Sequence, residues 1–187
     1  KLDMVPVKML TESSKRLDSI LRDLNTLLNY DKKLNALKTP LQLDEVAKET
    51  WEIYREKCAF LGGSFTWDFS GTGVLHLVKP YMDNIFQNML SNSLKYARPG
   101  IPPEIRFCGK LDAGMLRLEF RDNGLGIDLP ANKAKLFGIY QRFNPKAAEG
   151  NGLGLYLIRL QVEKMRGTID VDSELNAGTT FTITLPV

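Results

Sequence analysis

Cysteine and histidine are scarce in this sequence. Its 187 residues include two cysteines, Cys58 and Cys108, and one histidine, His76. The cysteines have no CxxC spacing and no histidine beside them, so the sequence patterns of a zinc site and of a disulfide framework are both absent. Two reduced cysteines are typical of a protein that works in the cytoplasm.

A large excess of one charge and long apolar runs are also lacking. The 25 Lys and Arg and the 22 Asp and Glu residues give a formal net charge of +3. This charge is too small to indicate nucleic acid or an anionic membrane surface as a partner. No apolar run approaches the roughly 20 residues of a membrane-spanning helix, and the first residues do not resemble a signal peptide. We expect a soluble segment without direct membrane contact. The sequence does not decide whether this segment belongs to a longer, membrane-anchored protein.

The first part of the chain has a helical apolar stripe. From Lys8 to Leu34, apolar residues fall on one face, and Leu10, Leu17 and Leu24 recur every seven positions. This pattern predicts one long α-helix, followed by a linker near residues 35–43. The helix is interpreted as half of a dimerisation hairpin, and the alternative is an amphipathic helix that lies on its own domain.

The remainder alternates between strand and helix patterns. Short alternating strands are predicted at 65–69 and 74–78, joined as a hairpin, and two further hairpins at 105–121 and 168–185. Helices are predicted at 44–61, from Pro80 to the Arg98-Pro-Gly turn, and after Gly154. The fold class is therefore α+β: a two-layer α/β sandwich with a mixed, mostly antiparallel sheet covered by helices on one face, preceded by one long helix.

A row of amides lies on the second of these helices. Asn84, Asn88 and Asn92 are one turn apart and therefore share a helix face. Asparagine is a poor helix former, so three of them on one face lower the stability of the helix. A functional role of these amides would explain why they are present. An amide oxygen suits Mg²⁺, and Lys95 and Tyr96 follow one turn later, where they could meet a phosphate and a nucleoside.

A second motif begins at the end of a predicted strand. Asp122 is followed by Asn123-Gly124-Leu-Gly126, and glycine lets a flat ligand approach the backbone closely. A carboxylate placed there can accept a hydrogen bond from an exocyclic amino group, as in adenine. Taken alone, the motif also fits an ordinary Asp-Asn-Gly turn.

The third and fourth motifs complete the set. Gly150-Asn-Gly152-Leu153-Gly154 opens a helix whose free N–H groups could meet phosphate, but it matches neither the Walker A nor the Rossmann pattern. The polar stretch before it could act as a lid, with Arg142 as an available cation. In the last strand, Thr179 has the parity of the inward-facing residues, and its hydroxyl is expected to find a partner near Asp122.

In order and spacing, these motifs resemble the N, G1, G2 and G3 boxes of the ATP-binding domain of sensor histidine kinases, in the wider family with Hsp90, MutL and type II topoisomerases. Residues 135–143 resemble the F box, although Ile139 stands where the family often has arginine. The resemblance implies ATP and Mg²⁺ as cofactors, with Asn92 and Asn88 at the metal. It implies that the nucleotide is bound by Asn88, Asn92, Lys95, Tyr96, Asp122, Gly124, Gly126, Arg142, Gly152, Leu153, Gly154 and Thr179.

The resemblance also implies domains and partners. Residues 1–40 would hold the second helix of a dimerisation and phosphotransfer hairpin plus a linker, and residues 41–187 the catalytic domain. A homodimer formed through the N-terminal helix and a response-regulator receiver domain are the expected partners, with no nucleic acid. The phosphate-accepting histidine belongs on the first hairpin helix, which this sequence lacks, and His76 is interpreted as structural or surface. The segment alone is therefore not expected to autophosphorylate.

The reaction type is inferred from one position. Where the ATP-hydrolysing relatives have a glutamate that activates water, this sequence has Asn88, whose amide has no basic lone pair. Transfer to a protein histidine is therefore favoured over hydrolysis. The alternatives are a serine kinase of the anti-sigma type, a conformational ATPase, and a non-catalytic nucleotide-binding dimerisation module.

Overall fold

The computed structural model describes Ser14 and residues 38–132, 135–138 and 152–187. Their order is β1 (Lys38–Gln42), α2 (Leu43–Phe60), β2 (Ser64–Gly71), β3 (Val74–Val78), α3 (Lys79–Lys95), β4 (Glu104–Asp112), β5 (Met115–Asp122), α4 (Leu129–Asn132), α5 (Gly154–Lys164), β6 (Thr168–Glu174) and β7 (Gly178–Pro186). The predicted lid, Arg142, Gly150 and, apart from Ser14, the predicted helix Lys8–Leu34 lie outside the described residues.

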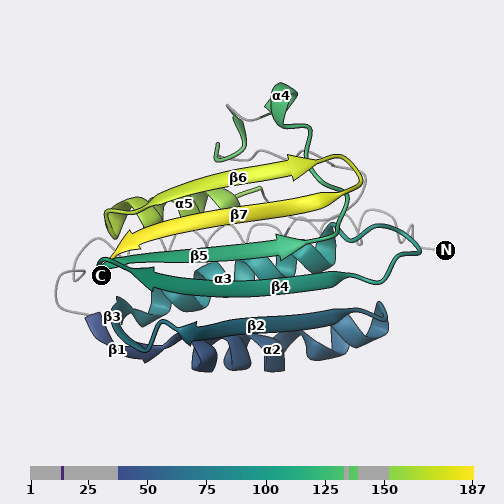
Figure 1. Cartoon of the computed structure of the whole chain (residues 1–187). Helices are drawn as coiled ribbons and strands as arrows, with labels where there is room; N and C mark the ends of the chain where they lie inside the picture. Colours follow the sequence, from purple (N-terminus) through teal and green to yellow (C-terminus); the bar gives the residue numbers. More distant parts are fainter. Residues whose placement is uncertain (1–13, 15–37, 133–134, 139–151) are drawn as a thin grey trace.

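Five strands form the central sheet in the order β2-β4-β5-β7-β6. Strands β4, β5, β7 and β6 pair antiparallel, while β2 and β4 pair parallel. Figure 1 shows α2, α3 and α5 behind this sheet, whereas no described helix crosses the face turned toward the viewer. The predicted α+β sandwich, with a mixed, mostly antiparallel sheet and helices on one face, is confirmed.

The predicted hairpin of 65–69 and 74–78 is wrong. Strand β2 pairs with β4, while β3 leaves the sheet and pairs with β1 in a separate two-stranded sheet. Between them Thr72 donates its hydroxyl to the carbonyl of Phe69 at 2.8 Å, so the turn closes locally without pairing the two strands. The path from β2 through α3 to β4 is a crossover, which parallel neighbours require.

Strand β1 occupies most of the predicted linker near 35–43. Its residues Lys38–Gln42 pair antiparallel with Val74–Val78 of β3. Helix α2 begins directly after β1 at Leu43, so Asp44 lies in the first turn and is not the N-cap. The division into 1–40 and 41–187 stays a prediction, and its boundary falls inside β1.

Helix α3 is held on the sheet by a periodic apolar face. Its buried positions come in pairs four residues apart, from Tyr81 and Met82 to Ser93 and Leu94. The Phe86 ring meets those of Phe107 and Phe120 on the sheet nearly at right angles, at 5.7 and 5.3 Å between centroids. Such edge-to-face pairs contribute about 0.5–1.5 kcal/mol each beyond their buried area. This packing orients α3 and leaves its three asparagines half-buried on the other side.

Candidate functional site

Asp122 lies at the end of β5, opposite Thr179 of β7 in the antiparallel register. Its Oδ1 accepts the backbone N–H of Gly124 at 2.9 Å, and its Oδ2 accepts the hydroxyl of Ser93 at 3.1 Å. Burial raises the pKa of Asp122, and hydrogen bonds from the Gly124 N–H, the Ser93 hydroxyl and the Thr179 N–H act in the opposite direction. Three elements thus hold one carboxylate at the sheet edge.

The glycine loop after Asp122 lies against the end of α3. A Cβ atom on Gly124 would come within 2.7 Å of the Tyr96 carbonyl oxygen, and Leu125 donates its N–H to that oxygen at 2.9 Å. The ammonium of Lys95 lies 5.1 Å from the centroid of the Tyr96 ring, a cation–π distance. The predicted adenine acid and the predicted phosphate cation therefore lie on adjoining segments.

The first and third motifs also meet. A Cβ atom on Gly154 would lie 2.6 Å from Asn88 Oδ1, so any larger residue at the start of α5 would have to displace the Asn88 side chain. The Nδ2 of Asn88 donates to the Asn84 carbonyl at 2.9 Å and to Asn84 Oδ1 at 3.1 Å. With its nitrogen committed within α3, the amide presents its oxygen toward the start of α5.

The start of α5 is shaped by the glycines that the sequence indicated. Gly152 has a φ of 68°, Leu153 is buried, and Gly154 is the first residue of the helix. Leu153 makes no side-chain capping bond, so no N-cap side chain occupies the first N–H groups of α5. Arg142 and the predicted lid, which would complete this part of the site, lie outside the described residues.

Thr179 points inward as predicted, but its hydroxyl partner is different. The side chain is buried, and its Oγ1 lies 2.9 Å from the hydroxyl of Ser173 on β6. Ser173 also donates to the Gly178 carbonyl and accepts the N–H of Ile127. From Thr179, the Asp122 carboxylate accepts the backbone N–H and not the hydroxyl. The hydroxyl pair therefore fixes β6 and β7 behind the carboxylate.

Two contributors were missed at the sequence level. Ser93 is a buried serine on the apolar face of α3, and a polar residue at such a position was a usable signal of a hidden partner. Arg98 donates Nη1 to the Asn176 carbonyl at 2.6 Å, and Asn176 donates its N–H to Leu125 at 2.8 Å. These bonds fasten the β6–β7 turn to the glycine loop, and no local pattern indicated them.

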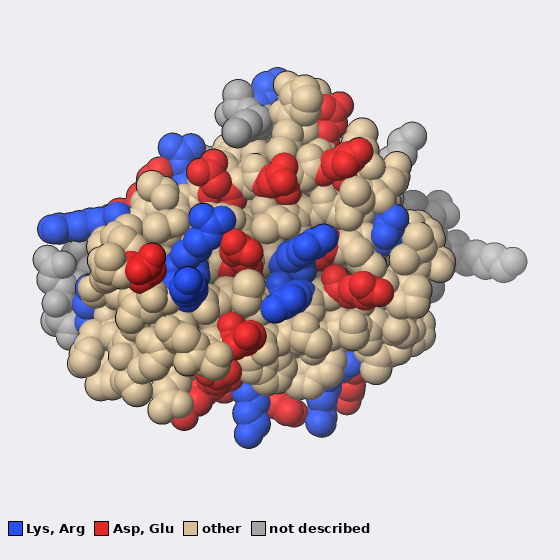
Figure 2. Space-filling view, in the orientation of Figure 1, with Lys and Arg blue, Asp and Glu red and all other residues tan. Residues whose placement is uncertain are grey.

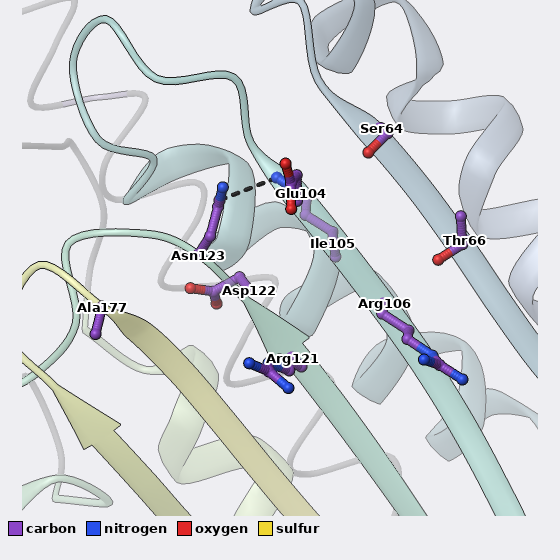
Figure 3. Close-up of a pocket in the computed structure, with 9 residues that line it drawn as sticks. All are labelled: Ser64, Thr66, Glu104, Ile105, Arg106, Arg121, Asp122, Asn123 and Ala177. Atoms are coloured by element: carbon purple, nitrogen blue, oxygen red, sulfur yellow. Dashed lines mark hydrogen bonds between the residues drawn. The ribbon is translucent and has the colours of Figure 1, made fainter.

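A cavity lies at the same sheet edge but opens on the other face. Figure 3 shows its lining residues, which come from the ends of β2, β4 and β5 and the β6–β7 turn. Asp122 is the one predicted site residue in this lining, and the amide row of α3 does not contribute. The cavity therefore adjoins the predicted nucleotide site at Asp122 and shares no other predicted site residue with it. Separately, none of the described helices is both long and apolar enough to cross a bilayer.

Residues 78–187 match the family described as "Histidine kinase-, DNA gyrase B-, and HSP90-like ATPase". The chain is 28% identical over 179 residues to "Sensor protein SrrB" of Staphylococcus aureus (strain NCTC 8325 / PS 47), covering 94% of this chain and 30% of that protein. It therefore spans about a third of the length of the curated relatives that it matches.

Solved structures show the same fold. Acinetobacter baumannii histidine kinase AdeS aligns over 100% of this chain and 86% of its own, with a TM-score of 0.76 and 18% identity. Full-length ShkA in complex with AMPPNP aligns over 100% of this chain and 40% of its own, with a TM-score of 0.74 and 22% identity. The fold and the family model agree with the four motifs, and the chain belongs to the family of histidine kinase-, DNA gyrase B- and HSP90-like ATPases.

Proposed function

We propose that this chain is the ATP-binding catalytic domain of a sensor histidine kinase. The parent protein would transfer the γ-phosphoryl group of ATP to a histidine and then to an aspartate on a response-regulator receiver domain. Residues 41–187 would bind ATP, and residues 1–40 would supply the second helix of a hairpin through which two copies dimerise. The named relatives AdeS and SrrB, a histidine kinase and a sensor protein, support this assignment.

The observation that carries the proposal is the fixed carboxylate of Asp122. Ser93, Gly124 and Thr179 hold its two oxygens by three hydrogen bonds, which leaves one of the four lone pairs of the carboxylate free. An adenine amino group would donate to one of these oxygens while Gly124 and Gly126 leave room for the base. Tyr96, at the adjoining end of α3, would lie beside the nucleoside.

The phosphates would extend from there along α3 toward the start of α5. Lys95 would attract them, and the N–H groups of the first α5 turn, after Gly152 and Leu153, would bind their oxygens. Arg142 stays a proposed contact. In the described part of the chain, no three His, Cys, Asp or Glu side chains gather to hold a metal, so a cation would depend on amide and phosphate oxygens.

Asn88 fits the requirements of such a cation. Its Oδ1 faces the start of α5, and its Nδ2 is bonded within α3. Mg²⁺ usually binds one or two protein oxygens and keeps its remaining sites for water and phosphate. Asn92 and Asn88 would hold it, and when bound it would neutralise charge on the triphosphate.

Transfer is favoured over hydrolysis by the same residue. An amide at position 88 has no lone pair basic enough to take a proton from water. The imidazole nitrogen would form its bond to the γ-phosphorus while the bond to the β–γ bridging oxygen breaks and ADP leaves. The rate enhancement would come from positioning and charge neutralisation. His76 is exposed on β3, within the small sheet with β1, and is not proposed as the acceptor.

The test uses this chain together with the preceding helix of the proposed hairpin, as the natural parent protein would contain it. It is incubated with γ-labelled ATP and Mg²⁺, and the bound label is then treated with acid and with base. We expect an acid-labile, base-stable label, as phosphohistidine gives. His76→Gln should label like the unchanged protein, because the acceptor is elsewhere, whereas Asp122→Asn should label far less at an ATP concentration near the Kd of the unchanged protein.

Other outcomes would replace the proposal with one of its alternatives. An acid-stable label would indicate a serine kinase of the anti-sigma type. Free phosphate without protein label would indicate a conformational ATPase. Nucleotide binding with neither label nor phosphate would indicate a non-catalytic nucleotide-binding module that only dimerises.

A further inference from the structure

Ser93 is a buried hydroxyl at the point where α3 meets the carboxylate of Asp122. It is 7% exposed, and its buried neighbours on the helix, Met89, Leu90 and Leu94, are apolar. A buried helical serine commonly bonds only the carbonyl one turn earlier, and Ser93 Oγ does lie 3.1 Å from the Met89 carbonyl oxygen. The same Oγ also lies 3.1 Å from Asp122 Oδ2, on a strand 29 residues away. Helix packing alone does not explain this second contact.

The hydroxyl of Ser93 has one hydrogen for these two acceptors. The Met89 carbonyl already accepts the backbone N–H of Ser93 within α3, since each helical carbonyl bonds the residue four positions later. The Asp122 oxygen carries negative charge when the side chain is ionised, and a hydrogen bond to an ionised acceptor is roughly twice as strong as a neutral one. The hydrogen therefore belongs to Asp122 Oδ2 whenever Asp122 is ionised.

Asp122 is held by neutral donors and forms no ion pair with any residue that the structure describes. Burial raises its pKa, and hydrogen bonds from the Gly124 N–H, the Ser93 hydroxyl and the Thr179 N–H lower it. Figure 2 shows basic and acidic side chains intermixed at the centre of the open sheet face, which lies across the sheet from α3. Ser93 is the one side chain among the three donors, so it is the donor that a substitution can remove.

The Ser93 bond has a consequence for the base that Asp122 can bind. An ionised carboxylate only accepts hydrogen bonds, and the site left on Asp122 fits a base that donates from an exocyclic amino group. Without the Ser93 hydroxyl, Oδ2 would have a second unfilled site in a buried setting, where the neutral, protonated carboxyl is favoured. A protonated carboxyl also donates, so it would tolerate a base that has no amino group.

We propose that Ser93 is a positioning residue for base selection: by donating to Asp122 Oδ2, it keeps the carboxylate in one orientation and as an acceptor only, which favours nucleotides whose base carries an exocyclic amino group. This role rests on the nucleotide site proposed above. Ser93 touches no ligand and acts through Asp122. Because α3 also carries Asn88 and Lys95, one helix would serve both the base and the phosphates.

The experiment compares ATP with purine riboside triphosphate, which has a hydrogen in place of the 6-amino group. Isothermal titration with Mg²⁺ gives the affinity of the chain for each nucleotide. We expect the unchanged protein to prefer ATP by about tenfold or more, the value of one hydrogen bond to a charged acceptor. In Ser93→Ala this preference should fall by at least about threefold. A general loss of packing would weaken both nucleotides equally, so the ratio of the two affinities reports base selection and not stability.

Two further variants separate the hydroxyl from the space that it fills. Ser93→Cys fills similar space with a weak donor, so its preference for ATP should stay closer to that of Ser93→Ala than to that of the unchanged protein. The matched control is Ser91→Ala, which changes a half-buried serine two positions earlier, on another face of the same helix. The control should keep the full preference for ATP.

Three results would overturn the role of Ser93 and leave the nucleotide site in place. They are an unchanged ratio in Ser93→Ala, a fully restored ratio in Ser93→Cys, and an equal fall in the Ser91 control. Equal affinity of the unchanged protein for both nucleotides would remove Asp122 as the base contact, and the role of Ser93 with it. If the unchanged protein binds neither nucleotide, the proposed function fails as well. A thermal unfolding curve shows that each variant is folded.

Discussion

Replacing Asp122 by asparagine should weaken nucleotide binding without lowering the folding stability of the protein. The substitution keeps the size of the side chain and removes its charge. Oδ1 still accepts the Gly124 N–H, and the new amide nitrogen can donate to the Ser93 oxygen. The Ser93 hydroxyl can then give its hydrogen to the Met89 carbonyl, which lies 3.1 Å away. The contacts with Gly124 and Ser93 are therefore kept while the cost of burying a charge disappears.

Nucleotide affinity should nevertheless fall. An adenine amino group would lose a charged acceptor, which contributes about 1.5–3 kcal/mol, and this corresponds to a roughly 10- to 150-fold weaker affinity. Isothermal titration with ATP and with ADP measures this change. Because the same variant is expected to be at least as stable as the unchanged protein, misfolding could not explain the loss.

The stability difference should depend on pH in a defined direction. Burial raises the pKa of Asp122 above the ordinary value of an aspartate, so the folded state holds the proton more tightly than the unfolded state. The stabilisation from this proton is complete below the unfolded pKa and is lost as pH rises through the folded pKa. Asp122→Asn should therefore gain stability relative to the unchanged protein as pH rises from about 4 to 7, measured by urea unfolding.

A clear result would refute this reasoning. Unaltered ATP affinity in Asp122→Asn would remove the carboxylate from the nucleotide site. A loss of more than about 2 kcal/mol of folding stability at pH 7 would show that the charge itself, and not the hydrogen-bond geometry, holds the sheet edge together.

Two glycine substitutions test the packing of the site. Gly126→Ala should destabilise the fold by more than about 2 kcal/mol and lower the melting temperature. The reason is that φ of Gly126 is 68° and the new methyl group would overlap the Glu174 carbonyl. Gly71→Ala is the control, because the space around Gly71 is open. Gly154→Ala should weaken Mg²⁺-dependent ATP binding by pressing on Asn88 Oδ1, and in a double-mutant cycle with Asn88→Ala its effect should shrink. Equal melting temperatures for the first pair, or strictly additive losses in the second, would contradict these explanations.

Local chemistry explains which elements were predicted correctly. The β4–β5 and β6–β7 hairpins have short turns with glycine, and Ala113 and Asn176 adopt the positive φ that such turns use. The start of α3 follows from Pro80 and its end from the Arg98-Pro-Gly turn. In each case neighbouring residues carry the whole signal, so the sequence pattern suffices.

The failures concern partners that are distant in the chain. Strands β2 and β3 were paired with each other because they are adjacent, yet a strand pattern does not specify its neighbour, and β1 and β4 compete for these positions. The direction of Thr179 followed from strand parity, but its hydroxyl partner Ser173 depends on how β6 lies beside β7.

The sequence by itself determined the chemistry of the four motifs, the type of most elements and the amide row on α3, because periodicity and turn residues act over a few positions. Only the tertiary structure decided that Ser93 bonds Asp122 from 29 residues away and that Arg106 and Arg121 share one cavity. Those contacts depend on strand order and on the placement of α3 against the sheet. Both are set by burial of the whole apolar core, which no local pattern contains.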